Sequence, residues 1–205
     1  MLGNNLSQLG VDAGQLGNDF RTFAGSLAWM PTTGEFGASS QFGDFEGHDA
    51  LATRIAGHYT RSDEDRQSQP NTEAIENSQI RLSDSSLMFT PGLFGSGIAV
   101  SDVMLQMSSV DAGAKYKGFA LEGEYYWRWL DDFRGTGTEA LPFDSRFDHG
   151  FQVQGSAMVK PRALQLYLSG SKVFGQYGDP SDWRTGVNVY PWTNQVVRWN
   201  TELIY

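Results

Sequence analysis

The chain has 205 residues, a net charge of −9 and no cysteine, and 24 of its residues are glycine. The lack of cysteine excludes disulfides, thiolate metal sites and cysteine nucleophiles, and the acidic charge argues against nucleic acid as a partner, since phosphate contacts need clustered Lys and Arg. Abundant glycine, with 13% aromatic residues, favours strands and turns over helices.

No window of the sequence holds 18 consecutive apolar residues, so we expect no transmembrane helix. A membrane-spanning β-strand needs only about 9 to 11 residues with every second one apolar, so negative mean hydropathy does not exclude the membrane. The first residues lack the basic region, apolar run and cleavage site of a signal peptide. We therefore expect the sequence to be a truncated part of a longer exported protein.

The first third of the chain predicts two strands and a long connection. The strands are expected over residues 23–29 and 51–59, and Arg54 and His58 share one face of the second. The segment 63–102 that follows is too long for a plain loop and carries apolar residues. We expect it to form a long loop that folds inward to constrict a pore.

The clearest hairpin runs from Ser108 to Leu130 around Lys117-Gly118. Gly118 can take the positive φ that a two-residue hairpin loop requires, which fixes the register of both strands. Apolar and charged residues then separate with a period of two. One face carries Phe119, Leu121, Gly123, Tyr125, Trp127 and Trp129, and the other carries Ala120, Glu122, Glu124, Tyr126, Arg128 and Leu130.

The rest of the chain repeats this alternation in four further strands. They are expected over residues 151–160, 164–169, 183–190 and 197–205, with short connections at 161–162 and 191–194 and longer ones at 132–148 and 176–182. Alternating short and long connections are typical of outer-membrane barrels. The predicted fold is all-β, an antiparallel meander of about eight strands that forms part of a transmembrane β-barrel, with residues 1–205 as one domain.

Aromatic residues provide a second indication of a membrane barrel. Phe119 and Trp129 lie ten residues apart. At ~3.3 Å per residue and a tilt near ~40°, this separation is roughly 25 Å along the membrane normal, the spacing of the two aromatic belts of a barrel. The predicted belt residues are Tyr116, Phe119, Trp127, Trp129 and Trp199.

The opposite faces of these strands predict the lining of a pore. The candidates are Arg54, His58, Asp111, Lys115, Glu122, Glu124, Arg128, Arg184, Arg198 and Glu202. Fixed charges of one sign select ions of the other, so the basic members favour an anion pathway. The acidic members on the same face favour a general diffusion pore instead, and both interpretations stay open.

No pattern in the sequence indicates catalysis, a metal site or a cofactor. Glu122 and Glu124 would project about 7 Å apart on one strand face, a separation that glycosidases use. The alternative hypothesis is therefore a soluble β-sandwich that binds or cleaves carbohydrate through these carboxylates, beside Tyr126 and Trp129. We favour the interpretation of Glu122 and Glu124 as water-facing pore residues, because carboxylates at alternate positions of a strand lose little hydration free energy where that face contacts water.

The two hypotheses predict opposite burial of the same side chains. In a barrel, Phe119, Leu121, Tyr125 and Trp127 face outward and are exposed in the absence of lipid. In a sandwich, a second sheet covers them.

Four segments resemble the phosphate-selective porin O/P family. They are KYKGFALEGEYYWRWLDDF, GFQVQGSAMV, VFGQYGDPSDWRTGVNVYPW and NQVVRWNTELIY. The resemblance implies a 16-stranded porin, commonly a homotrimer, in the outer membrane of Gram-negative bacteria, of which this chain is the C-terminal part. It implies passive diffusion of small hydrophilic solutes, with a preference for anions such as phosphate, across a lipid bilayer and without a cofactor.

Overall fold

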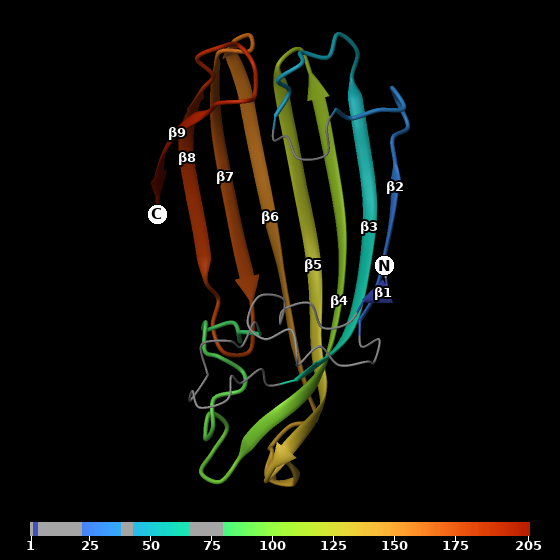
Figure 1. Cartoon of the computed structure of the whole chain (residues 1–205), viewed down its shortest axis with the longest axis vertical. Helices are drawn as coiled ribbons and strands as arrows, with labels where there is room; N and C mark the ends of the chain where they lie inside the picture. Colours follow the sequence, from blue (N-terminus) through green and yellow to red (C-terminus); the bar gives the residue numbers. More distant parts are fainter. Residues whose placement is uncertain (1, 4–21, 38–42, 66–79) are drawn as a thin grey trace.

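The computed structural model describes residues 2–3, 22–37, 43–65 and 80–205, and these residues form one sheet (Figure 1). The strands are β1 (Leu2–Gly3), β2 (Thr22–Trp29), β3 (Ala52–Asp65), β4 (Ala99–Tyr116), β5 (Phe119–Thr136), β6 (Ser145–Lys160), β7 (Leu164–Phe174), β8 (Ser181–Val189) and β9 (Trp199–Ile204). A single-turn 3₁₀ helix, η4 (Thr138–Ala140), follows β5.

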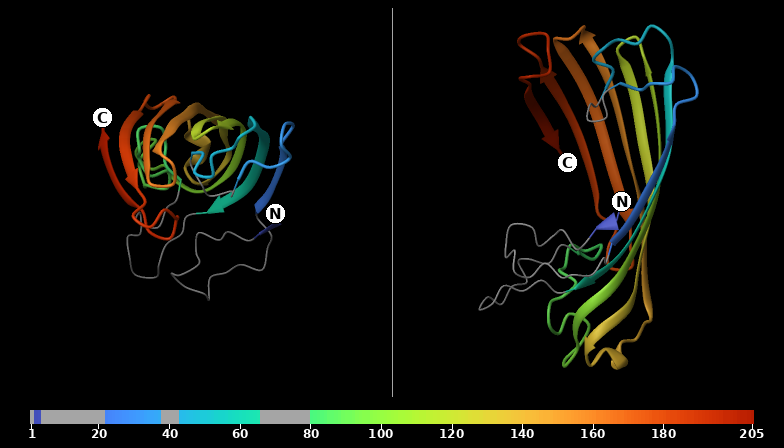
Figure 2. Two further views of the ribbon diagram at one scale, coloured as in Figure 1. Left: turned by 90° about the horizontal axis from the view of Figure 1, so that it is seen from above. Right: turned by 45° about the vertical axis from the view of Figure 1, so that its right-hand side comes forward.

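Each strand pairs antiparallel with the next one in the chain, so the sheet is a simple meander. β1 has only two residues, and the other eight strands agree with the predicted number. The prediction of an all-β antiparallel meander is confirmed. The sheet curves like part of a cylinder wall and is not closed, with β1 and β2 at one edge and β9 at the other (Figure 2). Among the described residues, no helix is long and apolar enough to cross a membrane.

The hairpin of β4 and β5 has the predicted two-residue loop. Tyr116 pairs with Phe119, and the register continues without a shift to Leu105 opposite Leu130. Lys117 and Gly118 have φ values of 48° and 85°. Positive φ at both positions is the geometry of a type I′ turn, whose twist matches that of the flanking strands. The sequence had indicated only Gly118 for this role.

Several predicted connections have different bounds in the structure. Strand pairing continues to Asp131 opposite Ser145, so the connection between β5 and β6 is 137–144 and not 132–148. Asp132, with a φ of 52°, interrupts the alternation of apolar and polar residues there, so the end of β5 could not be predicted from that pattern. The short connection expected at 191–194 spans 190–198.

The long segment predicted over 63–102 is also shorter at both ends. β3 continues to Asp65, which still pairs with Asp102, and β4 begins at Ala99, which pairs with Thr136 on β5. Residues 66–79 of this segment lie outside the described residues. The remainder, residues 80–98, is called the long loop below.

The two faces of the sheet differ in character. Register places large apolar side chains of all eight longer strands on the convex face, where many are exposed. They include Phe23, Leu27, Trp29, Ile55, Tyr59, Val110, Tyr116, Phe119, Leu121, Trp129, Val159, Leu166, Leu168, Trp183, Val189, Trp199 and Leu203. The concave face is polar over its middle part.

The buried apolar cluster lies on the concave face, at the end of the sheet away from the Lys117-Gly118 turn. It joins the long loop to the sheet, which we call the wall below. Its members are Ile80, Leu82, Met88, Phe89, Val100, Val103 and Leu130. The long loop therefore packs against the inner face of β4 and β5 (Figure 2). That the segment 63–102 constricts a pore stays a prediction.

Candidate functional site: a polar hollow on the concave face

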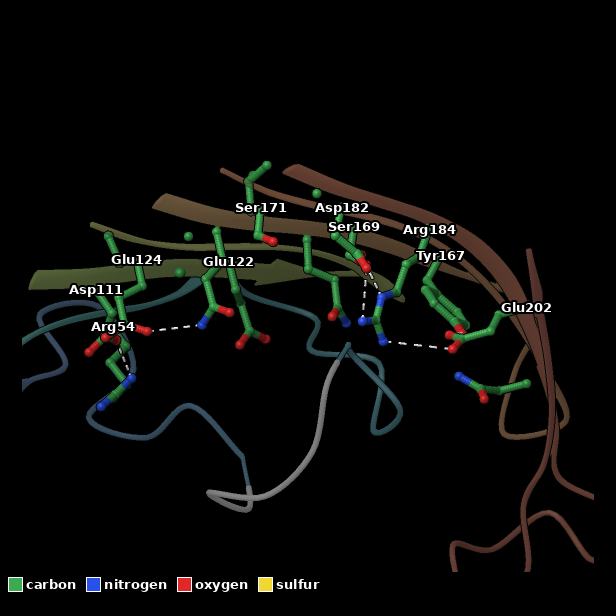
Figure 3. Close-up of a pocket in the computed structure, with 18 of the residues that line it drawn as sticks. Arg54, Asp111, Glu122, Glu124, Tyr167, Ser169, Ser171, Asp182, Arg184 and Glu202 are labelled. Carbon is green, nitrogen blue, oxygen red and sulfur yellow. Dashed lines mark hydrogen bonds and ion pairs between the residues drawn. The ribbon is translucent and has the colours of Figure 1, made fainter. Parts of the chain in front are cut away.

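A hollow of about 660 Å³ lies on the concave face and is lined by polar side chains from β3 to β9 (Figure 3). Eight of the ten predicted pore residues line it: Arg54, His58, Asp111, Glu122, Glu124, Arg184, Arg198 and Glu202. The period of two brings seven of them together, because every second residue of an antiparallel strand faces the same side and the register keeps that side constant across the sheet. Arg198 is the last residue of the connection before β9.

On β3 and β4, the carboxylate of Asp111 contacts two basic side chains. Arg54 Nη1 donates a hydrogen bond to Asp111 Oδ1, and His58 Nε2 lies 2.7 Å from Asp111 Oδ2. Asp111 stands directly opposite Glu124 in the register, and two like charges in that position repel each other. Arg54 and His58 reduce this repulsion, and Gln152 Nε2 donates to Glu124 Oε2 at 2.9 Å.

On β7 to β9, the charges and amides form a second network. Arg184 Nε donates to Asp182 Oδ1 at 2.6 Å, and its Nη1 lies 3.7 Å from Glu202 Oε1. Tyr167 donates to Glu202 Oε2 at 2.7 Å and accepts a hydrogen bond from Asn200 Nδ2 at 2.8 Å. These partners orient both carboxylates and the guanidinium on the wall.

Two predicted pore residues do not line the hollow. Lys115 is buried, with Nζ 3.0 Å from the carbonyl oxygen of Phe36 and 3.9 Å from Glu122 Oε1. Arg128 donates to Asp148 Oδ2 and, at 2.9 Å, to the carbonyl oxygen of Arg81 in the long loop. The side chains of both residues fix inward-folded segments to the wall.

Sequence reasoning missed eight polar residues of the hollow, seven of which carry an amide or a hydroxyl group. The structure adds Gln152, Gln154, Tyr167, Ser169, Ser171, Asp182, Asn188 and Asn200. The alternation places each of them on the charged face of its strand, and this signal was present in the sequence. Seven of them are uncharged and were left out because charge was treated as the only mark of a water-facing side chain, whereas Asp182 fell in the expected connection 176–182.

The predicted belt residues lie on the convex face, with different exposure. Phe119 and Trp199 are 66% and 67% exposed, whereas Trp129 is 37% exposed and Trp127 is half-buried. Trp127 packs against Tyr125 with ring centroids 5.0 Å apart, and Trp129 packs against Phe147 at 5.2 Å. These ring contacts, along β5 for Trp127 and between β5 and β6 for Trp129, account for the lower exposure.

The described lining of the hollow carries three arginines against five carboxylates, and the ion pairs hold Arg54 and Arg184. The residues that the structure describes contain no group of three or more His, Asp or Glu placed to hold a metal ion. The arrangement provides a hydrated surface with fixed charges of both signs and many hydrogen-bonding groups. Such a surface suits contact with dissolved polar solutes.

Comparison of the chain with models of protein families, with curated proteins and with solved structures finds no match. The family resemblance therefore depends on the four quoted segments alone. The function is therefore inferred from the curved sheet and its polar hollow.

Proposed function

We propose that this chain forms part of the wall of an outer-membrane β-barrel porin, through which small hydrophilic solutes diffuse passively. The observation that carries the proposal is a single curved sheet with an exposed apolar convex face and a polar concave face. A barrel that meets lipid outside and water inside needs this distribution. In an aqueous solution, so much exposed apolar surface would be an aggregation hazard.

Burial favours the barrel over the soluble sandwich. Phe119 and Leu121 are 66% and 59% exposed, and Tyr125 and Trp127 are half-buried by their neighbours on the same face. The described residues form one sheet, and none of them builds a second layer over these side chains. The carbohydrate-cleaving alternative at Glu122 and Glu124 loses the fold on which it depended.

Closure of the barrel requires further strands. Among the described residues, β1 pairs with only two residues of β2, so the rest of the outer edge of β2 and the outer edge of β9 expose backbone N–H and C=O groups that lipid cannot satisfy. Both edges must therefore pair with other strands in the membrane. The homotrimer and the outer-membrane location implied by the porin O/P resemblance belong to this proposal.

The charge balance of the wall favours general diffusion over selection of phosphate. Arg54, Arg184 and Arg198 are the basic groups that an anion would meet, and two of them are already bonded to carboxylates. A bound carboxylate competes with a passing anion for the same donors. Anion preference stays a finer proposal that rests on the family resemblance.

The test is conductance across planar lipid bilayers, with the natural full-length protein refolded in detergent. Discrete steps would support the porin proposal, and the reversal potential in asymmetric KCl would report ion preference. Folded, monodisperse protein that needs no detergent and gives no steps would contradict it. A matched sample of the same protein, unfolded in urea and added at equal concentration, controls for detergent leaks.

A further inference from the structure

A second inward-folded segment crosses the concave face at the end that carries the Lys117-Gly118 turn (Figure 2). It belongs to the connection between β2 and β3, and we call its described residues 36–37 and 43–48 the inner strap. Its side chains and backbone contact the wall at widely separated positions. The contacts are Lys115 on β4, Gly118 in the turn, Ser156 on β6, Arg162 after β6, Gln165 on β7 and Tyr190 after β8.

Asp44 fixes the inner strap to the wall. Its carboxylate is buried and accepts hydrogen bonds from the backbone N–H of Gly118 at 2.7 Å, of Gly47 at 3.1 Å and of His48 at 2.9 Å. His48 Nδ1 lies 2.5 Å from Asp44 Oδ1, and the carbonyl oxygen of His48 accepts from the N–H of Lys117 at 2.8 Å. A carboxylate with this many donors holds its segment in one position.

Close packing fixes the rest of the inner strap. The Phe36 ring lies against Gly113, where an added Cβ would come within 2.5 Å of the ring. Phe45 packs edge-on against Tyr190, with ring centroids 4.9 Å apart. A Cβ on Gly43 would lie 2.6 Å from Ser156 Oγ. The strap is therefore fitted to the wall over the width from β4 to β8.

Resting on the proposed function, we propose that the inner strap sets the size limit of the solute pathway and that Asp44 is its positioning residue. Phe36 lines the hollow, whereas none of the described residues of the long loop does. The narrowing that we propose therefore lies in the connection at the turn end. Constriction by the segment 63–102 stays a separate prediction, because residues 66–79 lie outside the described residues.

The experiment measures the swelling of liposomes that contain the natural full-length protein, in a monosaccharide, a disaccharide and a trisaccharide. These sugars are neutral, so their relative rates report size and not charge. Asp44→Asn replaces one acceptor oxygen by an amide donor that faces the N–H groups, which releases the strap. We expect the rate ratio of monosaccharide to trisaccharide to fall at least about threefold.

Glu46→Gln is the matched control. Glu46 lies in the same strap, but its ion pair with Arg162 is exposed, so the variant should keep the wild-type ratio. Leu130→Ala is the control for stability. It lowers stability at the opposite end of the sheet and should also keep the wild-type ratio, so a loss of general stability alone would not account for a fall in the Asp44→Asn protein.

Phe36→Ala is the second variant, used if Asp44→Asn does not fold. It removes the ring that lines the hollow, and it should also admit the trisaccharide faster. An unchanged ratio in a folded variant would overturn the inference and leave the porin proposal intact. Wild-type liposomes that swell in none of the sugars and give no conductance steps would instead contradict the porin proposal itself.

Discussion

The two segments that fold onto the concave face are held by different physics. The inner strap, at the turn end, is fixed by the buried carboxylate of Asp44 and its N–H donors. The long loop, at the opposite end, is fixed by a cluster of apolar side chains that includes Met88, Phe89 and Leu130. Hydrogen bonds to a charge fix direction and distance, whereas apolar packing fixes volume.

This difference predicts how each end responds to change. Apolar contacts are many and individually weak, so the cluster tolerates a similar shape and loses stability in proportion to the space left empty. The Asp44 site has few contacts, each sensitive to the loss of charge. Substitutions at the two ends should therefore differ in size and in pH dependence, and the following predictions test this.

Leu130→Ala should have the largest effect. Leu130 is 1% exposed and packs in the apolar cluster. Removal of its side chain leaves a cavity that typically costs about 3 kcal/mol of unfolding free energy. Urea titration in detergent micelles, followed by tryptophan fluorescence, measures this loss. Leu168→Ala, at a convex-face residue that is 57% exposed, is the control and should cost less than about 1 kcal/mol.

An equal loss in the two leucine variants would show that the cluster does not hold the long loop. Apolar packing would then not be what holds the long loop to the sheet.

Asp44→Asn should cost less, about 2 kcal/mol of unfolding free energy, because charge-assisted hydrogen bonds to three backbone N–H groups are weakened. The double variant with Leu130→Ala sharpens the comparison. The two sites lie at opposite ends of the wall and share no partner, so their losses should add within about 0.5 kcal/mol. A clear departure from additivity would mean that the strap and the long loop form one cooperative unit.

The sequence predicted the wall better than either inward-folded segment. A period of two places Glu122 and Glu124 on the inner face from local information alone, and the Lys117-Gly118 turn fixes their register. Asp44, in contrast, meets the N–H of Gly118, which is 74 residues away in the chain. No local periodicity marks such a contact.

The missed strand ends have a local cause. Asp132 interrupts the alternation at the end of β5, so the charged residues after Leu130 read as a loop although β5 continues to Thr136. The apolar residues of the segment 63–102 predicted that it folds inward to constrict a pore, and the described residues 80–98 pack against β4 and β5, but the constriction stays a prediction. The partners of those residues on β4 and β5 could not be predicted, because packing between distant segments depends on the curvature of the sheet.

The Asp44 site should also depend on pH. Burial raises the pKa of Asp44, but the hydrogen bonds from His48 and Gly118 outweigh it and hold the pKa below its usual value of 3.8. The hydrogen bond to Asp44 raises the pKa of His48 above its usual value of 6.5, against burial, and Glu35 adds to this increase. The Asp44 stabilisation is complete above pH 3.8 and is lost as the pH falls through the lowered pKa.

The His48 stabilisation has the opposite sign: it is complete below pH 6.5 and is lost as the pH rises through the raised pKa. Hydrogen exchange of the Gly118 amide should therefore be slowest between pH 3.8 and 6.5 and should accelerate on either side, after correction for the intrinsic rate. In Asp44→Asn this window should disappear. Exchange at the Val103 amide, beside the apolar cluster, should show no such window.

The smallest effect should come from the exposed ion pair between Glu46 and Arg162. Glu46 Oε2 lies 2.9 Å from Arg162 Nη2, but both side chains are more than half exposed. Water and salt screen such a pair, and ordering two long side chains costs entropy, so the coupling free energy should be at most about 0.5 kcal/mol. A double-mutant cycle of Glu46→Gln and Arg162→Gln, measured by urea titration, isolates this coupling. A coupling near that of the Asp44 contacts would mean that charge at any depth holds the strap, and that burial of Asp44 is not what distinguishes this end.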